Sequence, residues 1–221
     1  MDIVKSSIIN IAKKYGINKA ILFGSRARDD ANLKSDYDVA FICGNITAEQ
    51  KNKIIYELNN IDTLFKIDAV FLNNLQGGDM LTQNIIKDGK ILMSKFETKF
   101  NNFKKALASL KIAVADYDKT NLLSVRDGTI QRFEYTAELS WKTIREYLIE
   151  QGVININTPK SVMKEAFYAS IIDDDAGWIS ILNDRNSTSH IYDENEADEI
   201  FNRIKNNHIA LFDKLLEKLT V

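Results

Sequence analysis

The sequence predicts an α+β protein, in which a small α/β domain is followed by an all-α, up-and-down helical bundle. Up to about residue 93, short runs of β-branched and aromatic residues alternate with helical patterns. From about residue 96 the strand pattern disappears, and apolar residues recur at every third or fourth position. The 221 residues suit one large domain or two small ones, and we place the two domains at 1–94 and 95–221.

The N-terminal domain is expected to begin with an amphipathic helix over residues 1–16, because its apolar residues fall on one face. A second helix is expected over 47–61, with Thr47 as its N-cap, since a threonine side chain can accept a hydrogen bond from the first turn. The expected strands are 19–24, 37–43, 66–72 and a last one after a turn at Gly89.

The C-terminal domain is expected to be helical throughout. Gly152 is a candidate C-cap for one helix, and Thr158 followed by Pro159 is typical of the start of the next. Trp141, Trp178 and His208 are interpreted as packing residues. The expected helical stretches are 96–119, 127–152, 158–170, 174–187 and 195–219.

Composition and charge exclude several classes of protein. The net charge is −2, and neither half is strongly basic, which disfavours non-specific nucleic-acid binding but leaves a local RNA contact open. The single cysteine, Cys43, excludes a disulfide framework and is expected in the core. No apolar run reaches the roughly 18–20 residues of a membrane span, and the N-terminus lacks signal-peptide features. We therefore expect a cytoplasmic protein with no membrane contact.

The stretch LFGSRARDDANLKSDYDVAF, residues 22–41, carries a candidate phosphate site. Gly24 follows an apolar strand and permits close backbone approach, while Ser25 offers a hydroxyl and a backbone N–H. Arg26 and Arg28 add positive charge nearby. A glycine-serine turn alone is a weak signal, because such turns are common on protein surfaces.

Three aspartates form a candidate metal site. Asp36 and Asp38 are two residues apart, so an extended chain places them on one face, where they repel each other unless a cation is present. Asp68 lies inside the apolar run FKIDAVFL, where a charge is costly without a partner or a role. Oxygen ligands of this kind suit Mg²⁺, and one carboxylate could instead accept a proton. As an ordinary alternative, SDYD is a solvated turn.

In combination, these residues resemble the signature of the nucleotidyltransferase superfamily with the DNA polymerase beta-like fold, and GSRAR…SDYD is most similar to its minimal MNT members. The resemblance covers roughly residues 1–93. It implies that Gly24, Ser25 and the nearby arginines bind ATP, and that Asp36, Asp38 and Asp68 hold Mg²⁺ or act as base. The sequence departs from the pattern at Asp29, where many relatives have glycine, so the path of the following loop is open.

A second polar cluster lies late in the helical domain, in NDRNSTSHIYDENE. If this stretch is helical, Arg185 and Tyr192 lie nearly on one face, and Asn186 and His190 are neighbours. Such a cluster could cleave RNA, with His190 as acid or base and Arg185 steadying a phosphate. Spacing alone favours the simpler interpretation, in which Arg and His interact with a helix C-terminus.

This region resembles the HEPN family, and most closely the nucleotidyltransferase substrate-binding proteins, on the stretches FEYTAELSWKTIREYL and RNSTSHIY. The resemblance covers about residues 96–221. It implies a dimer through the helical domain and a toxin-antitoxin-like pairing, in which a HEPN ribonuclease is neutralised by AMPylation of its motif tyrosine, here Tyr192. The two parts are usually separate proteins, and here they share one chain.

Taken together, the sequence predicts an ATP- and Mg²⁺-dependent nucleotidyltransferase that adds AMP to a hydroxyl, with Tyr192 as one candidate acceptor. Three alternatives stay open. The chain could be a HEPN-type ribonuclease that uses Arg185 and His190 and is restrained by the N-terminal domain. It could modify a small molecule, or it could be a binding module with decayed sites.

Overall fold

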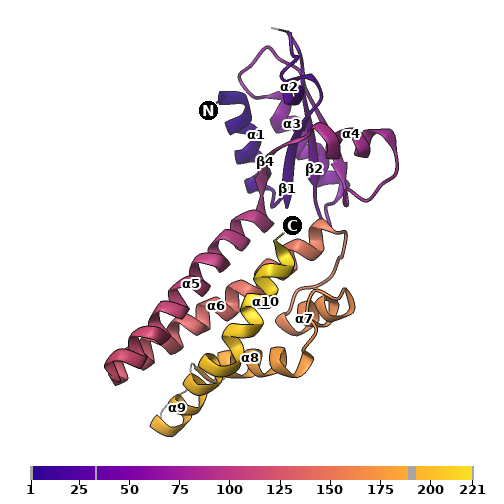
Figure 1. Cartoon of the computed structure of the whole chain (residues 1–221). Coiled ribbons are helices and arrows are strands. Elements are labelled where there is room, and N and C mark those ends of the chain that lie inside the picture. The colour runs from indigo at the N-terminus through magenta and orange to yellow at the C-terminus, as the bar shows by residue number, and fades with distance from the viewer. Residues whose placement is uncertain (1, 33, 189–192, 221) are drawn as a thin grey trace. The chain divides into compact units, whose positions relative to one another are not determined.

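The computed structural model describes residues 2–32, 34–188 and 193–220, and it confirms the α+β class (Figure 1). The chain divides into two compact units. The N-terminal unit comprises residues 1–96 together with residues 146–155, and the C-terminal unit comprises residues 97–145 and 156–221. Among the described residues, no helix is both long enough and apolar enough to cross a membrane.

The N-terminal unit is built on a four-stranded sheet of order β3-β2-β1-β4. Strand β1 pairs antiparallel with β2 and β4, whereas β2 and β3 are parallel. Helices α1 and α3 contact each other on one side of the sheet, and α4 contacts β1. The elements are α1 (Ile3–Lys14), β1 (Lys19–Phe23), α2 (Ser25–Arg28), β2 (Tyr37–Ile42), α3 (Ala48–Asn59), β3 (Ile67–Leu72), α4 (Met80–Asp88) and β4 (Lys90–Ser94).

Alternation along the strands produces two cores. On β2, Val39 and Phe41 pack into the larger core with residues of α1 and α3, while Ala40 and Ile42 pack into a smaller core with Ile85 of α4. Asp38 lies two residues before Ala40 and therefore belongs to the second face. The alternation thus assigns the acidic residues to the face that α4 covers only in part.

A segment remote in sequence completes this unit. Glu146 and Glu150, at the end of α6, accept hydrogen bonds from residues of the sheet and the loop before it. The Asn18 amide donates to Glu146 at 2.8 Å, and the Lys19 ammonium and Ser94 hydroxyl donate to Glu150 at 3.0 and 2.9 Å. Asn18 and Glu146 are both buried, at 7% exposure. The sequence predicts one boundary between residues 94 and 95, and the compact units of the structure add the later segment 146–155 to the first unit.

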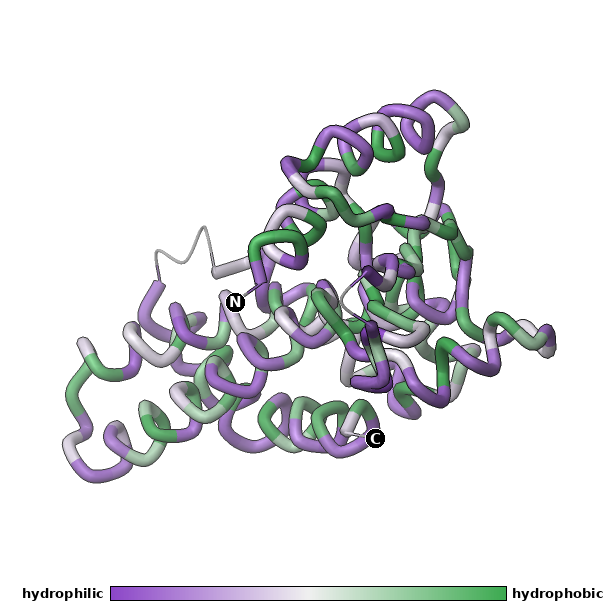
Figure 2. Tube along the Cα trace, turned by 90° about the horizontal axis from the view of Figure 1, so that it is seen from above, coloured by the Kyte–Doolittle hydropathy of each residue, from purple (hydrophilic) through white to green (hydrophobic). Residues whose placement is uncertain are grey.

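The C-terminal unit is helical, as the period of the sequence predicts. In Figure 2, apolar and polar positions alternate along its helices, consistent with one buried face on each. Phe212 lies at the centre of the core, with its ring 5.9 Å from Phe103, 6.2 Å from Phe133 and 5.8 Å from Trp178. Helices α5 (Lys95–Thr120) and α6 (Leu123–Glu150) belong mostly to this unit, and each has one end in the first unit. The remaining helices are α7 (Pro159–Tyr168), α8 (Asp175–Ser187), α9 (Glu194–Arg203) and α10 (Ile209–Leu219).

The last helical stretch is not one regular helix. Between α9 and α10, residues Ile204–His208 form a π-helical segment, marked by the hydrogen bond from the Ile209 N–H to the Ile204 carbonyl. A π-helical insertion adds one residue to a turn and rotates the side chains that follow. Here it accompanies the placement of His208 in the core, at 1% exposure.

Candidate active site

The turn after β1 brings the backbone of Gly24 against the carboxylate of Asp38. The two strands pair so that Phe23 lies opposite Asp38, and Gly24 adopts φ +71°, a conformation that favours glycine. A Cβ atom at Gly24 would overlap the Asp38 carboxylate oxygen. Ser25 follows directly as the first residue of α2. The glycine therefore permits the approach of strand end, serine and carboxylate that the sequence predicts.

Asp38 and Asp68 are neighbours on parallel strands. They are register partners on β2 and β3, so their side chains leave the same face of the sheet. The pKa of Asp38 is raised above its ordinary value by burial, then by the negative charges of Asp68 and Asp36. Lys66 and Arg28 oppose this effect. The carboxylates thus form a cluster with an excess of negative charge.

Lys66 holds one member of the cluster. Its ammonium lies 2.6 Å from Asp68 Oδ2, and both side chains are exposed. Asp36 lies just before β2 and is exposed. Among the described residues, no three His, Cys, Asp or Glu side chains are grouped so that they could hold a metal ion. The structure brings Asp38 and Asp68 side by side, but it does not gather all three acids around one point.

The donor set nevertheless fits a hard divalent cation. All the candidate ligands are carboxylate oxygens, which Mg²⁺ prefers, and Mg²⁺ commonly uses one or two of them together with substrate phosphates. The raised pKa of Asp38 has like-charge repulsion among its causes, which a cation between the acids would relieve. Asp38 and Asp68 are the pair best placed to hold it, with Asp36 within electrostatic range.

The two arginines predicted to bind nucleotide differ in position. Arg26 donates from Nε to the Ser35 carbonyl at 2.9 Å, and its guanidinium lies 3.9 Å from the Tyr37 ring centroid and 4.4 Å from that of Phe65. This contact is with the larger core, on the face opposite Asp38, so it fixes the loop before β2. Arg28 is on the acidic side, because its charge lowers the pKa of Asp38.

Asp29 explains how the chain tolerates the departure from glycine. It adopts φ +61° and caps α2 in the left-handed conformation, which aspartate can occupy at modest cost. Its carboxylate lies 2.5 Å from Lys90 Nζ on β4. The turn therefore keeps the conformation that a glycine would give it.

In the C-terminal unit, Arg185 lies near the end of α8 and lines a pocket with Asn186. Its Nη2 lies 3.2 Å from a Glu138 carboxylate oxygen, its Nη1 is 3.4 Å from Asn186 Oδ1, and its Nε is buried without a hydrogen-bond partner among the described residues. His190 and Tyr192, the other two residues predicted for this site, lie outside the described residues.

A buried ionic cluster next to Arg185 was not predicted. Asp184 accepts two hydrogen bonds from the Arg203 guanidinium, at 2.9 and 2.8 Å, and lies 2.7 Å from His208 Nε2. The His208 ring stacks on Phe133, with centroids 5.3 Å apart. Burial raises the pKa of Asp184, but hydrogen bonds from His208 and Arg203 outweigh it and lower the pKa below its ordinary value. The available signal was an acid three residues after Ile181, on the buried face of α8.

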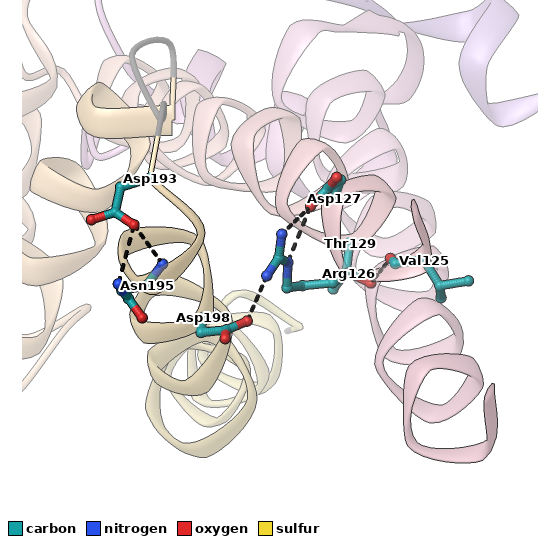
Figure 3. Close-up of polar contacts among 7 residues, drawn as sticks. All are labelled: Val125, Arg126, Asp127, Thr129, Asp193, Asn195 and Asp198. Carbon is teal, nitrogen blue, oxygen red and sulfur yellow. Dashed lines mark hydrogen bonds and ion pairs between the residues drawn. The ribbon is translucent and has the colours of Figure 1, made fainter. Parts of the chain in front are cut away.

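A buried arginine, Arg126, joins α6 to α9 (Figure 3). The Arg126 side chain is 5% exposed, and its Nη1 donates to Asp198 at 2.7 Å, while Nε and Nη2 donate to Asp127 at 3.1 and 3.0 Å. Asp193 caps α9 by accepting from the Asn195 N–H. Arg126 and the Asp184 cluster thus fix the helices on both sides of the segment that carries the HEPN-like motif.

Comparisons with known proteins assign two different families to the chain, with a boundary at residue 98. Residues 98–221 match the family described as nucleotidyltransferase substrate binding protein like, and residues 6–98 match polymerase beta, nucleotidyltransferase. A probable ribonuclease HepT from Haemophilus influenzae is 34% identical over 82 residues, which are 35% of this chain and 56% of that protein. The chain therefore spans just over half the length of this curated relative.

Solved structures resemble the same region. A structure from Haemophilus influenzae, described as the fold of a substrate binding domain of a nucleotidyltransferase, is 28% identical with a TM-score of 0.50. The match covers 55% of this chain and 99% of the other. The helical half and the sheet-containing half thus match two different kinds of domain.

Proposed function

Since the chain belongs to the nucleotidyltransferase substrate binding protein like family and carries a polymerase beta-type nucleotidyltransferase region before it, we propose that it is a Mg²⁺-dependent nucleotidyltransferase that transfers AMP from ATP to a hydroxyl. The observation that carries this proposal is the pairing of Asp38 with Asp68 beside the Gly24 turn. The helical unit then presents or selects the acceptor.

In the proposed reaction, the acceptor oxygen forms a bond to the α-phosphorus of ATP. The bond from that phosphorus to the oxygen bridging to the β-phosphorus breaks, and pyrophosphate leaves. Asp68 accepts the acceptor's proton or serves as a ligand in this proposal. Ser25 and the Gly24 turn position the phosphates, and Arg28 adds positive charge. Bound Mg²⁺ would offset the negative charge of the transferred group.

Incubation with labelled ATP and Mg²⁺ tests the proposal. We expect incorporation of label into the chain or an added acceptor, and a loss of at least about a hundredfold in the Asp36→Ala/Asp38→Ala variant. Asp62→Ala is a matched control, because Asp62 is an exposed acid of the same unit. EDTA should abolish labelling. Equal labelling of the control and the double variant would contradict the proposal.

The acceptor we propose first is Tyr192, in the same chain or in a partner copy bound through the helical unit. Peptide mass spectrometry after the labelling reaction should locate an AMP adduct on the peptide that contains Tyr192, and Tyr192→Phe should remove it. Light scattering of the full chain should give the mass of a dimer. An adduct elsewhere would reassign the acceptor and leave the transfer chemistry intact.

A second candidate is RNA cleavage by Arg185 and His190. It is favoured by the relative named a probable ribonuclease and by the buried Arg185 Nε, which has no hydrogen-bond partner in the described part of the chain. Because residues 146–155 belong to the N-terminal unit, the test uses the full chain rather than residues 96–221 alone. The Asp36→Ala/Asp38→Ala variant should degrade RNA, and His190→Ala in that background should stop it. RNA that stays intact with the first variant would argue against this activity.

A further inference from the structure

Lys66 lies among the acids of the candidate active site, and neither the sequence motifs nor the proposed reaction gives it a role. It directly precedes β3, and its ammonium lies 2.6 Å from Asp68 Oδ2. Because Lys66 and Asp68 are two residues apart on an extended chain, their side chains leave the same face of the sheet. Arg28, the other cation that lowers the pKa of Asp38, is instead paired with Asp30, at 3.1 Å.

The backbone of Lys66 is fixed beside the start of β2. The Tyr37 N–H donates to the Lys66 carbonyl at 2.9 Å, and Tyr37 stands between Asp36 and Asp38 in the sequence. The pKa of the Lys66 ammonium is raised by its hydrogen bond to Asp68 and by the negative charges of all three acids. The lysine stem therefore begins at a fixed point, within electrostatic range of the whole acid cluster.

The ammonium group, in contrast, can change its partner. The Lys66 side chain is 67% exposed and that of Asp68 is 47% exposed. Ion pairs at such positions are weak, because water and salt screen the two charges. Lysine carries its charge on a flexible stem, so the ammonium can move while the backbone stays in place. A stronger cation can therefore replace Lys66 at Asp68.

A divalent cation held by Asp38 and Asp68 would compete with Lys66 for the same carboxylate. Its charge is twice that of an ammonium, so it attracts the carboxylate more strongly and repels the lysine. The ammonium would still lie on the acidic face of the sheet, where Mg²⁺ sites commonly include substrate phosphates. Lysine binds phosphate groups as a point charge. The phosphates are therefore the next partner that electrostatics favours.

We propose that Lys66 is a counterion that exchanges partners: it neutralises Asp68 before a divalent cation binds, and it contacts the nucleotide phosphates after that cation has displaced it. The inference rests on the proposed function, because it takes the acids as metal ligands and ATP as the substrate. It adds a lysine outside the glycine-serine turn to the groups that bind the nucleotide.

Binding of Mn²⁺ without nucleotide tests the first half of the inference. Mn²⁺ uses the same oxygen ligands as Mg²⁺, and the free ion is measured by electron paramagnetic resonance. Lys66→Met removes the competitor, so this variant of the full chain should bind Mn²⁺ about two- to fivefold more tightly than wild type. Lys66→Arg keeps the charge and should bind Mn²⁺ as wild type does. Unchanged affinity in Lys66→Met would overturn the inference.

Lys53→Met is the matched control. Lys53 forms an exposed ion pair of the same length, 2.6 Å, with Glu49 in the same unit, and its loss changes the net charge equally. Its removal should leave Mn²⁺ affinity unchanged, and an equal gain in both variants would overturn the inference in favour of a general charge effect.

An Asp68→Asn background locates the effect of Lys66. Because Asp68→Asn removes the partner of Lys66, adding Lys66→Met there should change Mn²⁺ affinity by less than about twofold. A full effect of Lys66→Met in this background would show that the lysine does not act through Asp68, and it would overturn the inference.

Nucleotide binding tests the second half and should change in the opposite direction. The probe is an ATP analogue with a methylene bridge between the α- and β-phosphorus, which the proposed transfer cannot cleave, titrated by calorimetry at saturating Mg²⁺. Lys66→Met should bind the analogue about three- to tenfold more weakly than wild type, and Lys53→Met should bind it equally well. Weaker binding of both Mn²⁺ and the analogue in Lys66→Met would indicate a structural role and overturn the inference. Unchanged analogue affinity would overturn the phosphate contact.

These binding measurements can be told apart from the transfer reaction. If the wild type binds both probes with the expected effects of Lys66→Met but labels no acceptor, the proposed transfer fails and the role of Lys66 stands. If labelling occurs and Lys66→Met changes neither binding constant, the transfer stands and the inference about Lys66 is overturned.

Discussion

Asp38 in the N-terminal unit is partly buried and Asp184 in the C-terminal unit is buried, but acids dominate around the first and cationic or protonatable groups contact the second. Asp38 lies beside Asp68 and within range of Asp36, and its pKa is raised by burial and by those acids. Asp184 lies against Arg203 and His208, which lower its pKa despite burial. At Asp38 the positive charges of Lys66 and Arg28 do not outweigh burial and the two acids, whereas Asp184 has two cationic or protonatable partners in direct contact.

The two sites differ in charge balance: acids prevail around Asp38, whereas the charges around Asp184 are balanced. Proteins seldom keep a cluster of acids without compensation, because each charge raises the cost of the others. The excess at Asp38 is the negative charge that the proposed Mg²⁺ would offset. The balance at Asp184 points to a structural role, in which the cluster joins α8 to α9 and to the π-helical segment.

The largest expected effect on stability comes from removing Asp184, the centre of the buried ionic cluster. Asp184→Ala should lower the free energy of unfolding by about 3–5 kcal/mol, because it leaves Arg203 and the buried His208 without their shared partner. Urea denaturation would measure this. Glu199→Ala is a control, since Glu199 is 72% exposed and lies 3.7 Å from the same arginine, and it should change stability by less than about 0.5 kcal/mol. Similar effects from both variants would remove the distinction.

A smaller loss of stability is expected from a substitution at Gly24, whose backbone lies against Asp38. Gly24→Ala should cost about 1–3 kcal/mol of stability, because φ is +71° and the added Cβ overlaps the Asp38 carboxylate. Nucleotidyl transfer should fall with it, since the acid must move. Gly78→Ala is the matched control, because a Cβ there meets no atom within 4 Å. Thermal melts and the labelling assay would report both changes, and a fully active Gly24→Ala would contradict the proposed geometry.

Removing the excess charge should stabilise the protein. Asp38→Asn should raise the free energy of unfolding at neutral pH by up to about 1 kcal/mol, while abolishing transfer. The sign follows from linkage: with the folded pKa above the ordinary 3.8, the penalty is absent at low pH and appears as pH rises through the folded pKa. The gain should therefore vanish in acid.

Asp184 should show the opposite pH dependence. Its folded pKa is lowered, so its contribution is present above the ordinary value of 3.8 and is lost as pH falls through the folded pKa. The stability difference between wild type and Asp184→Asn should shrink in that acid range. Denaturation curves at several pH values would test both signs, and parallel trends for the two aspartates would contradict the comparison.

The smallest effect is expected beside the acid cluster, at Asp29. Asp29→Gly should stabilise the protein by no more than about 1 kcal/mol, because glycine occupies φ +61° without strain while the exposed pair with Lys90 contributes little. Denaturant titration would measure it. A marked loss of stability would show that the Lys90 contact matters more than the backbone conformation.

Local features of the fold could be predicted from the sequence. Thr47 and Thr158 both cap helices with reciprocal hydrogen bonds, as expected, and the strands lie within a residue of their predicted limits. These features depend on neighbouring residues, which the sequence displays directly. The proximity of Asp38 and Asp68 could also be expected. Each is a charged residue within an apolar strand, and a shared site would account for both.

Features that depend on distant residues could not be predicted in the same way. Arg26 was expected beside the nucleotide, but the rings of Tyr37 and Phe65 hold it on the other face. Trp141 was interpreted as a packing residue, and in the structure it is partly buried and also lines a pocket. The π-helical segment has no sequence pattern of its own, and it occurs where His208 is buried in the core. Such positions are decided by tertiary contacts rather than by local periodicity.

The end of α6 has a consequence for how the chain is made. Residues 146–155 belong to the same compact unit as the first 96 residues. On the ribosome, domains generally fold as they emerge, beginning with the N-terminal one. Here Glu146 and Glu150 contact Asn18 and Lys19, and about fifty further residues must be translated after residue 96 before these contacts can form. The N-terminal unit should therefore be complete only after much of the helical half has left the exit tunnel.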